Sequence, residues 1–172
     1  MDEMEQFSNI EEFESLVKSD ILKGGYQIED VPFPHEQFIL YFKVPIESQN
    51  MNVIVGMVKE TAYKLEIVSS LSFSQNHIET LKDNPDDIKQ KMVESLSMWL
   101  LPRTGNFAIE LNEENDFEMS FMINIVPIYE GDYSFAKLME SIDRIISYTI
   151  LSRKIIQSNL NKYDNQKKED LE

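Results

Sequence analysis

The sequence has no cysteine among its 172 residues. This absence excludes disulfide bonds, zinc–thiolate sites, iron–sulfur clusters and thiol nucleophiles together. Histidine is almost absent too, since only His35 and His77 occur, and neither stands in the His-Glu-x-x-His spacing of a zinc-binding helix. Five scattered glycines form none of the glycine-rich loops that hold phosphate groups. We therefore find no recognisable catalytic motif and expect neither a metal ion nor a cofactor. The alternatives are a metal site made of His35, His77 and Glu79 and a weak cation site in the turn at Glu113, Glu114 and Asp116.

Basic residues are scarce relative to acidic ones. The chain has 16 lysines and arginines against 31 aspartates and glutamates, which gives a net charge of −15. Such a surface repels the phosphate backbone and anionic membranes, and no basic stripe offsets that repulsion. We expect no nucleic acid and no membrane as partner, and we interpret the charge as a solubilising surface. Binding of a basic partner, or imitation of nucleic acid, is the alternative.

Long apolar runs are also missing. No stretch approaches the ~18 apolar residues of a transmembrane helix. The first residues include Asp2, Glu3 and Glu5, whereas a secretory signal peptide begins with basic residues and an apolar run. We expect a cytoplasmic protein.

What the sequence does contain is a clear succession of helical and strand periodicities. Gly24-Gly25 ends the first helix, and Pro32 and Pro34 interrupt the first possible strand. The predicted helices span 9–23, 85–101 and 134–161, with a possible helical turn at 76–82; the predicted strands span 26–31, 37–44, 52–59, 63–73, 107–111 and 117–126. Short connections between the strands predict an antiparallel arrangement. The fold class is therefore α+β with a mostly antiparallel sheet, in one domain over residues 1–161 followed by a polar, disordered tail over 162–172.

The predicted last helix has two apolar faces. One broad face contains Phe135, Leu138, Met139, Ile142, Ile145, Ile146, Thr149 and Ile156, and it is expected to pack on the sheet. Tyr148, Leu151 and Ile155 lie on the opposite side, at spacings of three and four residues. Each large apolar side chain contributes ~1.5–3 kcal/mol when it is fully buried. This second stripe therefore predicts a partner, which is either a second copy of the chain or the first helix folded back.

The central strands are apolar on both faces. Strands with one wet face alternate between apolar and polar residues, and strands covered on both faces do not. The second face of strands 37–44 and 52–59 carries Ile39, Tyr41, Ile54 and Val58, and we predict that a partner covers it. Gly56 within the second of these strands indicates a bulge or a close backbone approach. Trp99 lies in the apolar stripe of helix 85–101, where core packing and an interface anchor are both open.

The element order is helix, strands, helix, hairpin and long helix, with Gly25-Tyr26 after the first helix and acidic Glu29-Asp30 close behind. This order resembles the type III secretion chaperone-like fold, whose members include the acidic secretion chaperones and the YbjN-type proteins. An uncharacterised archaeal family is similar in layout, and the chain is expected to lie near it. The resemblance implies a homodimer that binds other proteins without ATP, and it carries no functional residue across.

Three functional hypotheses follow. The first is a non-enzymatic, homodimeric, chaperone-like module that binds a protein client through Tyr148, Leu151, Ile155, Ile39, Tyr41, Ile54 and Val58. The alternative is a small-molecule binding protein or enzyme with a pocket between the sheet and the long last helix, for which His35 and Glu36 are candidates. The third is an acidic decoy for a nucleic-acid-binding protein.

Overall fold

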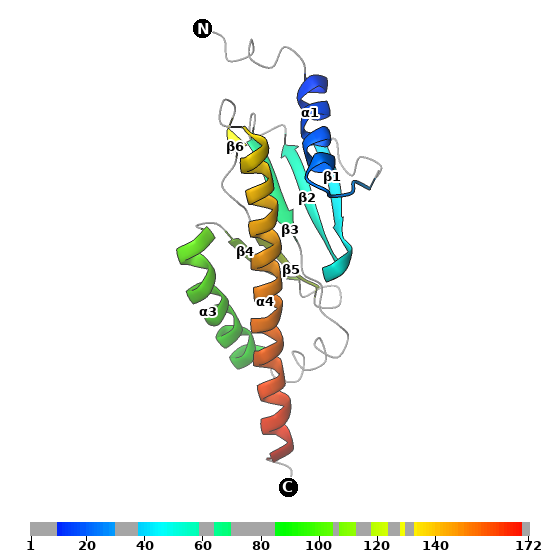
Figure 1. The fold of residues 1–172 in the computed structure, drawn as a ribbon. Coiled ribbons are helices and arrows are strands. Elements are labelled where there is room, and N and C mark those ends of the chain that lie inside the picture. Colours follow the sequence, from blue (N-terminus) through cyan, green and yellow to red (C-terminus); the bar gives the residue numbers. More distant parts are fainter. Residues whose placement is uncertain are drawn as a thin grey trace.

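The computed structural model describes residues 10–29, 38–58, 64–69, 85–104, 107–112, 118–123, 128–129 and 133–169. Its helices are α1 (Ile10–Lys23), α3 (Pro85–Thr104) and α4 (Phe135–Glu169), with a short 3-10 turn, η2 (Glu47–Gln49). Its strands are β1 (Phe38–Ile46), β2 (Met51–Val58), β3 (Lys64–Ser69), β4 (Phe107–Asn112), β5 (Glu118–Ile123) and β6 (Ile128–Tyr129). The α+β class is confirmed, and Figure 1 shows α1 and α4 lying over the same face of the sheet formed by β1, β2 and β3.

The main sheet has the order β1-β2-β3-β6, and every neighbouring pair is antiparallel. The two residues of β6 pair with Lys64 and Leu65. Strands β4 and β5 form a separate antiparallel hairpin, as the alternation of the sequence predicted. Between β1 and β2 the chain turns through η2, and Asn50 closes that turn with φ of 47°. Asparagine is one of the few residues besides glycine that adopt this left-handed conformation readily.

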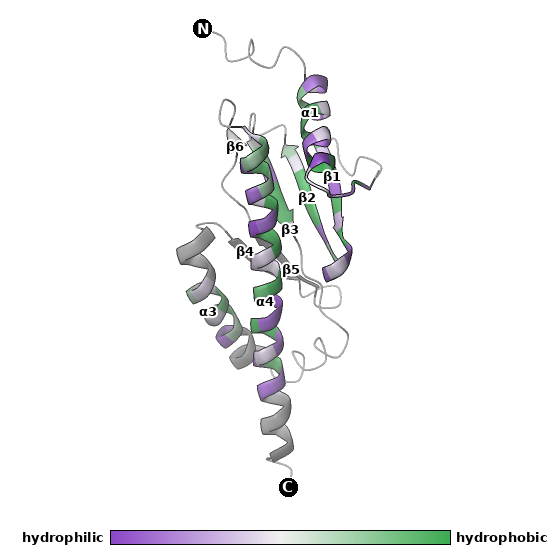
Figure 2. Ribbon diagram, viewed as in Figure 1, coloured by the Kyte–Doolittle hydropathy of each residue, from purple (hydrophilic) through white to green (hydrophobic). Residues whose placement is uncertain are grey.

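One face of the main sheet forms the core. Leu40, Phe42, Val44 and Ile46 of β1 stand opposite Met57, Val55, Val53 and Met51 of β2, and Leu65 and Ile67 of β3 continue the same face; all ten are buried. Two helices cover these residues. The buried residues of α1 are Val17, Asp20 and Ile21, and those of α4 are Leu138, Ile142, Ile145, Thr149, Ser152, Ile156 and Leu160. In Figure 2 strands β1, β2 and β3 are largely green, whereas α1 and the coloured part of α4 alternate between green and purple as amphipathic helices do.

Helix α4 begins where its cap predicts and ends later than predicted. The Ser134 side-chain oxygen accepts a hydrogen bond from the Lys137 backbone N–H at 3.2 Å, which is the geometry of an N-cap. The helix continues to Glu169, beyond the expected end at Asn161 and through most of the 162–172 stretch that we expected to be disordered. None of the helices in the described part of the chain combines the length and the hydrophobicity needed to cross a bilayer.

The end of α1 depends on two glycines with different roles. Gly25 has φ of +86°, the Tyr26 N–H donates to the Ile21 carbonyl at 3.2 Å, and the Gly25 N–H donates to the Leu22 carbonyl at 3.0 Å. This pair of bonds is a Schellman motif, which uses a left-handed residue to end a helix. Gly24 makes room for α4, because a Cβ atom there would lie 2.1 Å from the Met139 sulfur and the flexible Met139 side chain would have to move.

The strand predicted at 26–31 is reduced to one backbone bridge within the described residues. Glu29 pairs with Lys43 of β1 in antiparallel fashion, and the Glu29 N–H donates to the Lys43 carbonyl at 2.9 Å. Residues 30 and 31 lie outside the described residues, as does the helical turn predicted at 76–82. The chain after α1 therefore runs beside β1 without forming a full strand over 26–29.

Two tyrosine–aspartate hydrogen bonds join α1 to α4 in opposite directions. Tyr133, just before α4, donates to Asp20 of α1 at 2.7 Å. Tyr26, just after α1, donates to Asp143 of α4 at 2.5 Å. Burial, followed by the hydrogen bond to Asp143, raises the pKa of Tyr26 to about 12. The same two causes, with Asp20 as acceptor, raise the pKa of Tyr133 further.

Aromatic contacts support this junction between the helices. The rings of Phe13 and Tyr133 meet edge to face at 5.2 Å between centroids. The Lys23 ammonium lies 4.7 Å from the centroid of the Phe135 ring, in a cation–π contact. Polar and aromatic contacts therefore hold α1 against the first turns of α4, in addition to its apolar residues Val17 and Ile21.

The substitution Tyr133→Phe should destabilise the fold by about 1–3 kcal/mol, because it leaves the Asp20 carboxylate buried without this donor. Tyr26→Phe is the matched control, since its hydrogen bond to Asp143 is exposed and the expected loss is smaller, about 0.5–1.5 kcal/mol. Urea denaturation of the two variants and the wild type measures both values. Equal losses in stability would contradict the expectation that the buried Asp20 carboxylate depends more on its tyrosine donor than the exposed Asp143 carboxylate does.

Stability should also fall in alkaline solution for a specific reason. The unfolded chain releases the Tyr26 proton near pH 10, and the folded chain keeps it until about pH 12. The contribution of this pair is therefore complete below pH 10 and is lost as the pH rises from 10 to 12. We expect the free energy of unfolding to fall less steeply above pH 10 in the Tyr26→Phe/Tyr133→Phe double variant than in the wild type. If the free energy of unfolding fell equally steeply with pH in both proteins, the two tyrosines would not be the cause of the alkaline loss of stability.

Candidate functional site

The second stripe of α4 is covered by α3 of the same chain. The rings of Tyr148 and Trp99 meet edge to face, with 6.4 Å between their centroids and 79° between their planes. Tyr148 and Ile155 pack against the hydrophobic core, and Leu151 is partly exposed. Figure 1 shows α3 beside the C-terminal half of α4. Helix α3 thus covers part of this stripe within the same chain, and a further partner at Tyr148, Leu151 and Ile155 stays a prediction.

The position of Trp99 distinguishes between the two roles predicted for it, core packing and an interface anchor. It is partly buried and packs against the core together with the buried Met92 and Leu96 of the same helix. Core packing is therefore the role of this tryptophan in the described structure. Met98, its neighbour in sequence, points to solvent with 80% of its surface exposed.

The second face of the main sheet brings two predicted residues together. Tyr41 of β1 stands opposite Gly56 of β2, which stands opposite Glu66 of β3. In the adjacent row, Lys43, Ile54 and Val68 occupy the same three strands. Tyr41 and Ile54 are partly exposed, unlike their buried neighbours on the core face. The side chains of Ile39 and Val58, the other two predicted residues, lie outside the described residues.

Val68 belongs to this face, and the sequence prediction missed it. It is partly exposed and pairs with Ile54 across the β2–β3 ladder. The sequence could have identified it, because Val68 is two residues after Glu66 in an alternating strand and therefore lies on the same face as Glu66. We name the partly exposed apolar group Tyr41, Ile54 and Val68 the outer sheet patch.

Charged groups lie at two corners of the outer sheet patch. The Lys43 ammonium forms an ion pair with the Glu29 carboxylate at 2.5 Å, and its side chain keeps 30% of its surface exposed. Glu66 lies at the diagonally opposite corner, beside Gly56. Gly56 has no side chain, yet its backbone is buried. This agrees with Tyr41, opposite it on β1, covering the glycine backbone. The surface thus combines apolar side chains with one cation and one anion.

Catalytic chemistry gains no support from the described side chains. Among the residues described, no group of three histidines, aspartates or glutamates has the arrangement of a metal site. The candidates His35, Glu36, His77 and Glu79 lie outside the described residues, as does the turn at 113–116.

An α+β chain with a long helix across an antiparallel sheet is thus the class of protein that the fold defines. Residues 14–156 match the model of a family described as uncharacterized conserved protein (DUF2299), and the chain belongs to that family. The fold is similar to the crystal structure of an uncharacterized protein from Methanothermobacter thermautotrophicus, with a TM-score of 0.68 and 14% identity over 86% of this chain and 98% of that one. At that identity the likeness shows the fold alone. No curated protein matches the chain.

These comparisons refine the resemblance noted from the element order. An uncharacterised family and an archaeal structure of the same fold agree with the expected closeness to an archaeal family of similar layout. Neither of them points to a type III secretion chaperone or a YbjN-type protein. The chaperone-like part of the expectation therefore has no support beyond the element order.

Because Tyr148 lies beneath α3, the substitution Tyr148→Ala should act on stability. We expect a loss of about 1–3 kcal/mol in the free energy of unfolding, since an aromatic contact with Trp99 and packing against the core are removed together. Met98→Ala on the same helix pair is the control and should change stability by at most about 0.5 kcal/mol, because Met98 is exposed. A neutral Tyr148→Ala that alters the molecular mass in solution would restore the stripe as an interface.

Proposed function

We propose that the protein is a non-enzymatic, chaperone-like protein-binding module that works as a homodimer, with the outer sheet patch at the contact between the two copies. One observation carries this proposal: Tyr41, Ile54 and Val68 lie on three adjacent strands of the sheet face opposite the core, and all three are partly exposed. Scattered apolar residues on a surface are ordinary, whereas a contiguous group with a polar rim is typical of an interaction site.

The charges around the patch favour a second copy as its occupant. Lys43 and Glu66 stand at opposite corners, with Tyr41 and Val68 at the other two. A two-fold axis in the plane of the contact, along the diagonal from Tyr41 to Val68, sets Lys43 of each copy opposite the partner's Glu66. A surface of this kind is self-complementary, which is the requirement of a two-fold contact between identical chains.

Steric considerations agree with a contact at this face. Gly56 has no side chain to hold two sheets apart within the patch. In the described part of the chain, the buried apolar residues of α1, α3 and α4 all belong to the core cluster. Two sheets that pack face to face stand ≈ 10 Å apart, a distance that tyrosine, isoleucine and valine side chains fill from both sides.

The alternative of a pocket between the sheet and α4 gains little from the described residues. Where α4 crosses the core face, Leu138, Ile142 and Ile145 have no exposed surface, and they contribute to one continuous cluster with the strands. The packing around these three residues is apolar, and the buried polar residues of the same stripe, Thr149 and Ser152, lie farther along α4. Protein binding is therefore the function that the described geometry supports best.

Ile54→Asp should convert the dimer into a monomer, because it places a carboxylate at the centre of an apolar contact. Sedimentation equilibrium at micromolar concentration should give twice the chain mass of 20.2 kDa for the wild type and the single chain mass for the variant. Leu22→Asp is the matched control, since Leu22 is 52% exposed on α1 and lies away from the patch. It should remain dimeric.

Charge reversal provides an independent check that does not alter the apolar group. Lys43→Glu and Glu66→Lys should each weaken the dimer, and the combined variant should recover it, because the two charges then face each other again with exchanged signs. A wild type that is monomeric under these conditions, or an Ile54→Asp variant that stays dimeric while folded, would overturn the proposal.

A further inference from the structure

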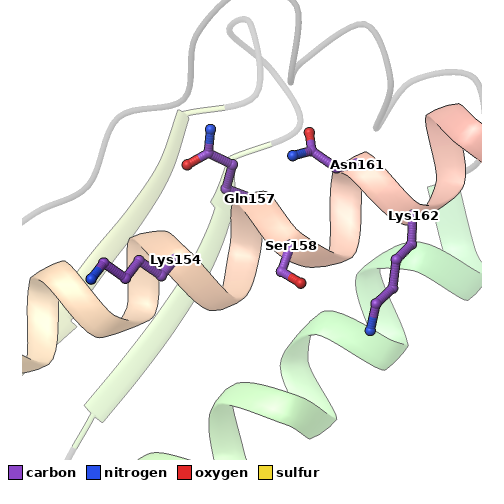
Figure 3. Close-up of a pocket in the computed structure, with 5 residues that line it drawn as sticks. All are labelled: Lys154, Gln157, Ser158, Asn161 and Lys162. Carbon is purple, nitrogen blue, oxygen red and sulfur yellow. The ribbon is translucent and has the colours of Figure 1, made fainter.

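The outer face of α4 carries a polar hollow near its C-terminal end. Its lining residues are Lys154, Gln157, Ser158, Asn161 and Lys162, and its volume is about 400 Å³. They follow one another at spacings of three, one, three and one residues, so they form one stripe of the helix. All five are exposed. Figure 3 shows Gln157 and Asn161 projecting to the same side of the helix, with Lys154 and Lys162 at the two ends of the stripe.

The stripe stands out in this acidic molecule because its two charges are positive and the described residues offer them no carboxylate partner. Residues 153–168 contain five basic side chains and one acidic one, in a chain that has 31 acidic residues against 16 basic ones. Three other cations of the described chain are engaged: Lys43 pairs with Glu29, Arg144 pairs with Glu140, and Arg153 donates to the Gln49 carbonyl at 2.8 Å. Lys154 and Lys162 have no carboxylate within ion-pair distance among the described residues.

We propose that this stripe of α4 binds an acidic, extended segment of a client polypeptide. The inference deepens the proposed function and rests on it, because it names the chemistry of the client that a protein-binding module of this shape accepts. The two ammonium groups bind carboxylates of the client. Gln157 and Asn161 come between the two lysines along the helix, and each amide can both donate to and accept from a peptide backbone.

The spacing of the lysines matches an extended chain. Lys154 and Lys162 are eight residues apart, which is about 12 Å along a helix that rises 1.5 Å per residue. In an extended segment, residues that are four apart lie on the same side and are separated by about 13 Å. A client with acidic residues at positions i and i+4 therefore meets both lysines at once. Gln157 and Asn161, one turn apart, then face the peptide groups between those two acidic residues.

The composition of the hollow favours a polypeptide over nucleic acid. None of the described lining residues is aromatic, so these residues offer a base no stacking platform. Its two lysines neutralise few phosphates, and the net charge of −15 repels a long polyanion as a whole. A short acidic segment carries only the charge that the two lysines can balance.

Fluorescence anisotropy with a labelled ten-residue peptide tests the proposal on the full chain. The probe carries glutamates at positions i and i+4 in a neutral serine–threonine–valine background, and its matched control carries glutamines at the same two positions. We expect the glutamate peptide to bind about tenfold or more tightly than the glutamine peptide at low ionic strength. The difference should shrink in high salt, which screens exposed charges.

Two double variants show whether the stripe is responsible. Lys154→Glu/Lys162→Glu should lose about tenfold or more in affinity for the glutamate peptide. Lys18→Glu/Lys91→Glu changes the net charge equally at exposed positions on α1 and α3 and should retain most of the affinity. Equal losses in both double variants would mean that net charge alone governs binding, and they would overturn the proposal. So would the absence of any preference for glutamate over glutamine.

A single-stranded oligonucleotide of the same length distinguishes the other class of partner. If it binds more tightly than the glutamate peptide, and Lys154→Glu/Lys162→Glu abolishes that binding, the stripe is a nucleic-acid surface and the proposal is wrong. The mass of each sample is measured in parallel. A dimer that ignores the glutamate peptide overturns this inference and leaves the homodimer standing. A folded, monomeric Ile54→Asp variant that binds the peptide supports the stripe even where dimer formation fails.

Discussion

The apolar stripe of α4 against the core face of the sheet is the contact around which the other elements are arranged. Seven residues from Leu138 to Leu160 recur at spacings of three and four, and all are buried. Those residues reach across β2 and β3, and Arg153 attaches the helix to the η2 turn through the Gln49 carbonyl. Because side chains of a helix repeat in direction every 3.6 residues, packing one face of α4 on the sheet fixes which residues form its other faces. Only those other faces can contact further segments.

The two other helices occupy different lengths of α4. Helix α1 meets its first turns through Tyr133, Met139 and Asp143, in a junction that is largely aromatic and polar. Helix α3 meets the second half through the contact of Trp99 with Tyr148. Two polar residues, Thr149 and Ser152, lie in the buried stripe at this crossing. The Thr149 hydroxyl donates to the Ile145 carbonyl, and the Ser152 hydroxyl oxygen has no hydrogen-bond partner. We have no physical account of the unpaired serine.

Secondary structure was predictable to the extent that local signals specify it. The glycine pair after Lys23, the serine before Phe135 and the alternation of 107–111 with 117–126 each correspond to an observed boundary or hairpin. The alternation of strand 63–73 also separated Leu65 and Ile67 from Glu66 correctly. The end of α4 was missed because a polar sequence such as 162–169 has no periodicity to indicate whether a helix continues. The segment 26–29 was predicted as part of a strand, and only one bridge of it forms.

The sequence by itself determined which residues are apolar and at what period, and hence that α4 has a second stripe and that β1 and β2 are apolar on both faces. Only the tertiary structure decided what covers each of them: α3 lies on the stripe at Tyr148, while Tyr41 and Ile54 on the sheet stay partly exposed. The same holds for Lys154 and Lys162, for which the described residues supply no carboxylate partner, because charge pairing depends on neighbours distant in sequence. The physical reason is that period and composition are local properties, whereas burial and charge pairing depend on contacts between segments whose relative placement no local pattern encodes.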